Sequence, residues 1–154
     1  MKKKLILVLS LIALMVCLLA ISVSAVEVDG IYYTLNNSGE TPVAEVSTEN
    51  RASCKLETVS IPATITVGGD TYKVTSIDKA AFKNCKSLKK LTIGKNVTTI
   101  GAKAFFKCKK LKSITFKGTK LKKVGKRAFK GIYKKVKIRA PKSKLNKYRK
   151  YFRK

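Results

Sequence analysis

Apolar residues recur along this chain at a fixed spacing. Residues 74–96 read VTSIDKAAFKNCKSLKKLTIGKN, and residues 97–119, which begin 23 positions later, read VTTIGAKAFFKCKKLKSITFKGT. A third and looser copy begins at Leu121 and reads LKKVGKRAFKGIYKKVKIRA. A period in the low twenties is typical of a solenoid, whose units cannot bury their apolar faces alone. The pattern therefore predicts a stack of about three units over residues 74–140.

Two spacings alternate inside each unit. In the first unit Ile77, Ala81 and Cys85 lie four residues apart, a spacing that places them on one face of a helix. Leu91 and Ile93 lie two apart, which is the spacing of a strand with one buried face. Each unit is therefore predicted to hold one short helix or helical turn and one short strand. The predicted fold class is an α/β solenoid with a parallel ladder of strands.

These positions resemble the BspA-type leucine-rich repeat of bacterial surface proteins, with the pattern I-x-x-x-A-F-x-x-C-x-x-L-x-x-L-x-I. The first unit matches it with Ile77, Ala81, Phe82, Cys85, Leu88, Leu91 and Ile93, and the second with Ile100, Ala104, Phe105, Cys108, Leu111, Ile114 and Phe116. The third keeps Val124, Ala128, Phe129 and Ile138, but has Ile132 for the cysteine and Lys135 for a leucine. A degenerate last unit is expected at the end of an array. The resemblance implies a leucine-rich-repeat fold and a role in adhesion and interaction at the cell surface.

The chain begins with a predicted export signal at residues 1–25. Lys2, Lys3 and Lys4 precede a long apolar run that ends in Val23-Ser24-Ala25, a small-residue cleavage site. The run is long enough for an uncleaved membrane anchor to stay an alternative. Both interpretations place the remainder outside the cytoplasm, so we expect a secreted or cell-surface protein.

Residues 26–73 are predicted to form an N-terminal β cap. Asp29-Gly30 marks a turn in an alternating stretch, and Gly68-Gly69-Asp70 marks a hairpin. Leu56, Val59 and Ile61 take the places of Leu88, Leu91 and Ile93, which predicts a degenerate zeroth repeat without its helix.

Residues 141–154 are predicted to form a basic capping helix. Leu145, Tyr148 and Phe152 lie on one helical face, and Ser143 is the expected N-cap. A frayed basic tail is the alternative.

Charge is distributed very unevenly along the sequence. The chain has 35 basic and 8 acidic residues, a net charge of +27, and all eight acids lie at or before Asp78. From Lys79 to Lys154 there are 29 basic residues and no acid. A stretch of ordinary composition would hold roughly nine acids, so codon bias or a need for solubility explains the pattern poorly. We therefore expect anionic partners: cell-wall or host glycans, or surface and matrix proteins.

The candidate contacts form two groups, one on the outward strand positions and one on the convex side of the units. The strand group is Lys90, Thr92, Ser113, Thr115, Lys117, Lys137 and Arg139, and the convex group is Lys103, Lys107, Lys126, Arg127 and Lys130.

The residue types argue against catalysis. The chain has no histidine, which removes the commonest general base, and its scattered carboxylates form no pair. We expect no enzyme activity, no cofactor and no metal. Cys85 and Cys108 occupy the same place in adjacent units, where the favoured interpretation is that they are small buried residues. A disulfide between them is the alternative, and it would leave Cys54 unpaired.

The predicted function is that of an exported, non-enzymatic binding module. Extracellular, non-specific nucleic-acid binding is one alternative, although lysine predominates and the aromatic residues mostly have core spacing. A structural or membrane-active cationic protein is the other.

Overall fold

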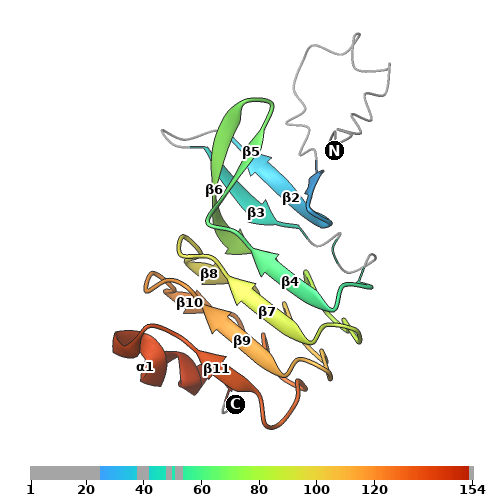
Figure 1. The fold of residues 1–154 in the computed structure, drawn as a ribbon, viewed down its shortest axis with the longest axis vertical. Helices are drawn as coiled ribbons and strands as arrows, with labels where there is room; N and C mark the ends of the chain where they lie inside the picture. The colour runs from blue at the N-terminus through green and yellow to red at the C-terminus, as the bar shows by residue number, and fades with distance from the viewer. Residues whose placement is uncertain (1–24, 38–41, 48–49, 51–53, 153–154) are drawn as a thin grey trace.

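The computed structural model describes residues 25–37, 42–47, 50 and 54–152 (Figure 1). The predicted export signal lies outside the described residues, except that Ala25 begins the first strand. The strands are β1 (Ala25–Val28), β2 (Ile31–Asn36), β3 (Val43–Val46), β4 (Thr58–Ile61), β5 (Thr64–Val67), β6 (Asp70–Ile77), β7 (Lys90–Ile93), β8 (Thr99–Ile100), β9 (Ser113–Phe116), β10 (Lys123–Val124) and β11 (Lys137–Arg139). A short helical segment follows them: η2 (Lys142–Lys144), α1 (Leu145–Arg149) and η3 (Lys150–Phe152).

The strands form two sheets. The larger runs in the order β1-β2-β3-β6-β8-β10, with β5 paired to β6, and the smaller runs β11-β9-β7-β4. In the smaller sheet all pairs are parallel, and Leu91 lies opposite Ile114, which lies opposite Ile138. Figure 1 shows these four strands side by side and pointing the same way. The predicted ladder of parallel strands is therefore present in the described part of the chain.

Each unit also contributes a second, shorter strand to the larger sheet. Ile77, Ile100 and Val124 lie opposite one another there, in parallel pairs of β6 with β8 and of β8 with β10. The repeat position of Ile77, Ile100 and Val124 therefore belongs to the larger sheet, and the position of Leu91, Ile114 and Ile138 belongs to the smaller sheet. The interior lies between the two sheets.

The segment before the first unit also supplies a strand to each sheet. β4 places Val59 opposite Leu91 and Ile61 opposite Ile93, as the sequence predicts. β3 pairs in parallel with β6 and places Val46 opposite Ile77. We did not expect this second pairing, because the β5–β6 hairpin interrupts the period between this segment and the first unit.

Both predicted hairpin turns are observed. β1 and β2 join through Asp29 and Gly30, whose φ angles are 52° and 78°. β5 and β6 join through Gly68 and Gly69, whose φ angles are 61° and 95°. Two positive φ angles match the right-handed twist of the flanking strands.

The short helix predicted within each unit is not formed. Residues 79–84 and 102–107 are turns. Ala80, Lys103 and Arg127 have φ angles of 61°, 57° and 59°, and such left-handed residues end a helix. The N–H groups donate across units instead: Phe82 to the Ala104 carbonyl and Phe105 to the Ala128 carbonyl, both at 2.8 Å. The four-residue spacing therefore marks a turn that returns its apolar residues to the interior.

Three phenylalanines stack at the centre of these turns. The ring centroids of Phe82 and Phe105 are 5.3 Å apart with 6° between the planes, and those of Phe105 and Phe129 are 5.3 Å apart with 4°. Their exposed fractions are 1%, 0% and 5%. Large buried aromatic side chains dominate the energetics of a core, so this column is a main source of stability.

The C-terminal segment closes the stack over the last unit (Figure 1). Tyr148 is fully buried and its ring lies 5.0 Å from that of Phe116. The ring centroids of Phe152 and Phe129 are 4.5 Å apart. The predicted cap is therefore present as a short α-helix between two 3₁₀ turns. The expected N-cap role of Ser143 is wrong, because Lys144 precedes α1 and no side chain caps it.

The third unit is more open than the first two. Val124, Ile132 and Ile138 are only half-buried, whereas Ile100, Cys108 and Ile114 at the matching places in the second unit are buried. A terminal unit has a neighbour on one side only, and the helical segment covers part of the other.

A disulfide joins Cys54 to Cys85, with Cα atoms 5.3 Å apart. The expectation of an unpaired Cys85 is therefore wrong, and so is the alternative pairing with Cys108. Cys108 is free and buried, and its thiol donates to the Phe82 carbonyl at 3.1 Å. Burial raises the pKa of this thiol to about 12. The disulfide thus ties the cap to the first unit.

Candidate functional site

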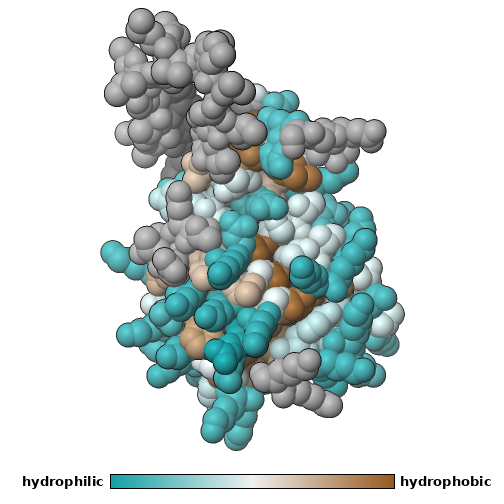
Figure 2. Space-filling model, turned by 180° about the vertical axis from the view of Figure 1, so that it is seen from behind, coloured by the Kyte–Doolittle hydropathy of each residue, from teal (hydrophilic) through white to brown (hydrophobic). Residues whose placement is uncertain are grey.

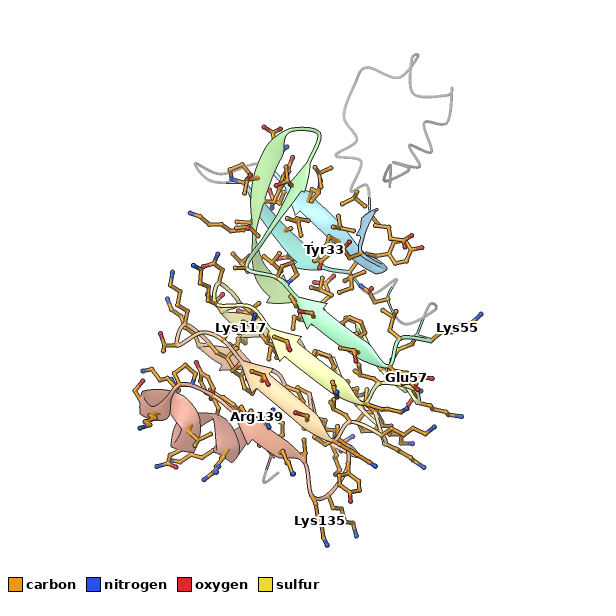
Figure 3. The ribbon with its side chains drawn as sticks, viewed as in Figure 1. Tyr33, Lys55, Glu57, Lys117, Lys135 and Arg139 are labelled. Carbon is orange, nitrogen blue, oxygen red and sulfur yellow. A yellow bond between two sulfur atoms is a disulfide. The ribbon has the colours of Figure 1, made fainter. Side chains whose placement is uncertain are left out.

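The outward face of the smaller sheet carries the predicted strand contacts in two rows. Lys90, Ser113 and Lys137 are aligned in one row, and Thr92, Thr115 and Arg139 in the other. Side chains alternate along a strand, so these residues share the face opposite Leu91, Ile114 and Ile138. The structure therefore brings six of the seven predicted strand residues together. Lys117 lies just beyond the end of β9 (Figure 3).

This face is not continuously basic. Thr92, Ser113 and Thr115 are half-buried and form a hydroxyl strip in its middle. The exposed cations Lys90, Lys137 and Arg139 lie on either side of that strip. In the row of Lys90, Ser113 and Lys137, lysine alternates with serine from one unit to the next.

The second predicted group lies on a different part of the surface. Lys103 and Lys107 belong to the turn at residues 102–107, and Lys126, Arg127 and Lys130 belong to the corresponding turn of the third unit. Lys103 is half-buried and the other four are exposed. Figure 2, the view from behind the smaller sheet, shows hydrophilic side chains around a central area of less polar and apolar residues. The two groups therefore do not converge on one site.

A cleft of about 550 Å³ opens at the carboxyl ends of β4, β7 and β9. Its lining consists of Thr64, Lys95, Asn96, Lys117, Gly118, Thr119 and Lys120. Of these, only Lys117 was predicted as a contact. A repeated signal could have revealed two of the others, Lys95 and Gly118, but not how the loops approach one another: in the first two units a glycine and a lysine follow the strand directly, as Gly94-Lys95 and Lys117-Gly118.

Hydrogen bonds hold the walls of this cleft. The Asn96 side-chain amide donates to the Ala63 carbonyl at 3.0 Å, which also accepts from the Val74 N–H at 3.0 Å. On the opposite wall the Tyr148 hydroxyl donates to the Gly118 carbonyl at 3.2 Å. A Cβ at Gly118 would lie 2.5 Å from the Lys95 carbonyl oxygen, so the close approach of these two loops requires glycine.

The single ion pair among the described residues lies at the other ends of the strands. Lys89 Nζ is 2.6 Å from Glu57 Oε1, and these residues directly precede β7 and β4. The hydrogen bond from Lys89 and its charge lower the pKa of Glu57. Figure 3 shows Glu57 and Lys117 at opposite ends of the strands. The cationic cleft therefore has no carboxylate in its lining.

The described part of the chain contains neither a cluster of metal ligands nor a membrane-spanning helix. No group of three or more His, Cys, Asp or Glu residues is arranged to hold a metal ion there. Within the same residues, no helix is long and apolar enough to cross a membrane.

Residues 75–153 match the model of the BspA type leucine rich repeat region (6 copies). The match covers 79 of the 154 residues of the chain, which is just over half. The chain belongs to the BspA-type leucine-rich repeat family. This confirms the resemblance on which the fold prediction rested.

Solved structures support the same assignment. A leucine rich cell surface protein from Faecalibacterium prausnitzii shares 30% identity with a TM-score of 0.56, over 69% of this chain and 27% of its own. A leucine-rich repeat protein from Bacteroides capillosus shares the fold with 18% identity and a TM-score of 0.57, over 77% of this chain and 99% of its own. A leucine-rich repeat protein from Bacteroides ovatus also shares it, with 23% identity and a TM-score of 0.50, over 77% of this chain and 38% of its own. The chain thus spans about a quarter of the length of the Faecalibacterium protein. No curated protein matches it.

Family membership indicates a non-catalytic binding or interaction module of exported or surface proteins. The BspA-type motif specifies only interior positions, such as Phe105, Cys108 and Leu111, which are all buried. The lysines of the two faces and of the cleft occupy positions that the motif leaves variable. The family motif thus accounts for the interior of this chain and does not specify its basic surface.

Proposed function

We propose that this protein is an exported, non-enzymatic binding module of the cell surface whose repeats form a short solenoid and bind anionic polymers. The observation that carries the proposal is the absence of acidic residues after Asp78, in a stretch with 29 cations. Adhesion of the producing cell to a glycan-covered surface would follow from such binding. Attachment of the protein to anionic polymers of its own wall rests on the same chemistry.

The stacking of units brings like charges close together, which lowers the stability of the protein when no anionic ligand is bound. Lys103 aligns with Arg127, and the turn residues of adjacent units are joined by hydrogen bonds such as that from the Lys103 N–H to the Lys126 carbonyl, at 3.1 Å. Like charges that repeat at the spacing of adjacent strands repel one another. The one ion pair of the described residues, Lys89–Glu57, compensates a single lysine. A bound polyanion would relieve this repulsion, and salt would do so in part.

The exposed aromatic residues give no support to the binding of single-stranded nucleic acids. Among the described residues, Tyr133 is the one large hydrophobic side chain that is exposed, at 39%. Lys112 Nζ lies 5.6 Å from the centroid of its ring. Single-stranded nucleic acids are bound by several aromatic side chains on which successive bases stack. A single tyrosine with a lysine over its ring provides no such platform.

Competition binding tests the proposal. The purified protein is incubated with poly(glycerol phosphate), a heparin-like glycan, double-stranded DNA and a matrix protein over a range of salt concentrations. We expect binding of the phosphate polymer or the glycan at moderate salt, with an affinity that falls steeply as salt rises. Failure of every polymer to bind at moderate salt would contradict the proposal. Tighter binding of DNA, or of the matrix protein, would replace it with that alternative.

Two variants with the same loss of charge show which face binds. One replaces Lys90, Lys137 and Arg139 with glutamine, and the other replaces Lys107, Lys126 and Lys130. All six side chains are exposed, so the fold is expected to tolerate either set. A larger loss of polymer affinity in the first variant assigns binding to the strand face, and a larger loss in the second assigns it to the turns.

A further inference from the structure

We propose that the cleft at the carboxyl ends of β4, β7 and β9 is a subsite for one tetrahedral oxyanion, a phosphate or sulfate group carried on a polyol chain. This inference rests on the proposed function and adds where a charged group of the polymer is held. The cleft has a volume of about 550 Å³. Pockets for small ligands have volumes in the range of about 300–1,000 Å³, so one sugar phosphate or polyol phosphate unit fits.

The cations in the lining favour a tetrahedral oxyanion. Lys95, Lys117 and Lys120 line the cleft, and they come from the loops that follow β7 and β9. A lysine ammonium acts as a point charge, whereas the planar fork of arginine matches a carboxylate in two parallel hydrogen bonds. Three lysines around one cleft suit a group that presents oxygens in several directions.

The uncharged part of the lining matches a polyol. Thr64 and Thr119 contribute hydroxyl groups, which can both donate to and accept from the hydroxyls of a sugar or a glycerol. No aromatic side chain lines the cleft, so it offers no surface on which a nucleobase would stack. The charged and uncharged halves of the lining together fit a phosphorylated or sulfated polyol.

The cleft is formed before any ligand arrives. Asn96 fixes the segment that leads to Thr64 through its bond to the Ala63 carbonyl, and Tyr148 fixes the loop of Gly118 from the capping helix. Tyr148 is fully buried, so this wall is anchored in the core. A preorganised site loses less conformational entropy on binding, which favours affinity.

The cleft lies between the start of β5 and the loops that follow the strands β7 and β9 of the first two units. The pairing of Arg139 with Thr115 places Pro141 at the position that Lys117 occupies in the second unit. The chain turns there into the capping segment η2, whose Lys142 and Lys144 stand at the places of Lys95 and Lys120 but are not part of the lining of the cleft.

Two triple variants with equal loss of charge test the subsite. Lys95, Lys117 and Lys120 are replaced with glutamine in one, and Lys86, Lys109 and Lys134, three exposed lysines outside the cleft and outside both candidate faces, in the matched control. Affinities for poly(glycerol phosphate) and for a heparin-like glycan are measured at one moderate salt concentration. We expect the cleft variant to lose at least about tenfold in affinity for one of these polymers and the control less than about threefold. The polymer that responds identifies phosphate or sulfate as the bound group.

Equal losses in both variants would overturn the subsite and leave the proposed function intact. Failure of the unaltered protein to bind either polymer would overturn both. Polygalacturonate, a carboxylate polymer, supplies a further arm in which the cleft variant is expected to behave like the control. A tenfold loss for that polymer too would contradict the preference for a tetrahedral oxyanion.

Amide spectra locate the bound group directly. Titration of glycerol 3-phosphate into the isotope-labelled protein is expected to shift the N–H signals of Asn96, Gly118 and Thr119 in a saturable manner. The signals of the turn at residues 102–107 are expected to stay unchanged. Shifts that are spread over both regions, or confined to the turn, would contradict the assignment.

Discussion

The N-terminal cap and the repeats share one interior, but their surfaces carry charge of opposite sign. Residues 26–78, which comprise the cap and the first strand of the first unit, carry all eight acids and three basic residues, whereas residues 79–154 carry 29 basic residues and no acid. The two sheets nevertheless run through both regions without a break, since β4 pairs with β7 and β6 pairs with β8. The interior therefore specifies the fold in both regions, and the surface of the repeats is free to serve another purpose.

The difference extends to how each region is held together. The cap depends on antiparallel hairpins and on the Cys54–Cys85 disulfide, which joins it to the first unit. The repeats depend on a parallel ladder and on stacked phenylalanines. Changes in one region are therefore expected to have effects that differ in kind from changes in the other.

Loss of the central phenylalanine is expected to have the largest effect. Phe105 packs between Phe82 and Phe129, and its side chain is fully buried. Phe105→Ala should lower the free energy of unfolding by about 3–5 kcal/mol, because it removes buried area and leaves a cavity. Denaturant unfolding measures the change. Phe106→Ala is the control: that side chain is half-buried, and its loss should cost under about 1.5 kcal/mol. Similar losses in both variants would contradict the role of the stack.

Removal of the disulfide tests how the cap is joined to the repeats. Cys54→Ala should lower the free energy of unfolding by about 3 kcal/mol, because the bond closes a loop between residues 31 positions apart. A reductant should lower the melting temperature of the unaltered protein and leave that of the variant unchanged. Thiol titration of the unfolded chain, with and without reductant, counts the paired cysteines independently. A reductant effect that persists in the variant would contradict the pairing.

Ionic strength should affect the repeats more than the cap. Salt screens repulsion among exposed charges, and the repeats carry these without acids to offset them. The melting temperature of the protein is therefore expected to rise by several degrees between low and high salt. Calorimetry in chloride salts measures it. A melting temperature that stays flat would show that the charge is not costly, and would remove one support of the proposed function.

The smallest expected effect concerns Asp78, which lies next to Glu45 where the two regions meet. Burial, together with Glu45, raises the pKa of Asp78 to about 6 from an ordinary value of 3.8. The folded protein thus holds this proton more tightly than the unfolded chain does, so the stability from this group is lost as pH rises from about 4 to about 6. Asp78→Asn should melt higher than the unaltered protein at pH 7 and show no difference near pH 4. A difference that is independent of pH would contradict the shift.

The interior of this protein could be predicted from the sequence because its apolar positions repeat. The register of Leu91, Ile114 and Ile138 and the place of Val59 follow from that period alone. The turns could not be predicted as such, because Ala81 and Cys85 have a helical spacing whether or not a helix forms. The left-handed conformation of Ala80 and Lys103 prevents a helix there. Alanine and lysine are not the residue types that usually adopt this conformation.

The candidate site was harder to predict than the fold. The outward positions of the strands follow from alternation, so Lys90 and Arg139 were found. The cleft depends on how the loops after β4, β7 and β9 approach one another, and on a hydrogen bond from Tyr148 in the capping helix. These contacts join residues far apart in the sequence, and no local pattern reveals them. The pairing of Cys54 with Cys85 was missed for the same reason.

Fractionation of the cells that produce this protein tests most directly whether the repeats bind an anionic surface. The cells are washed at low and at high salt, and the protein is followed in the medium, the wash and the membrane fraction. We predict that the chain, shortened by its export signal, stays with the cells at low salt and appears in the high-salt wash. Retention in the membrane fraction after that wash, or free release into the medium at low salt, would contradict the account.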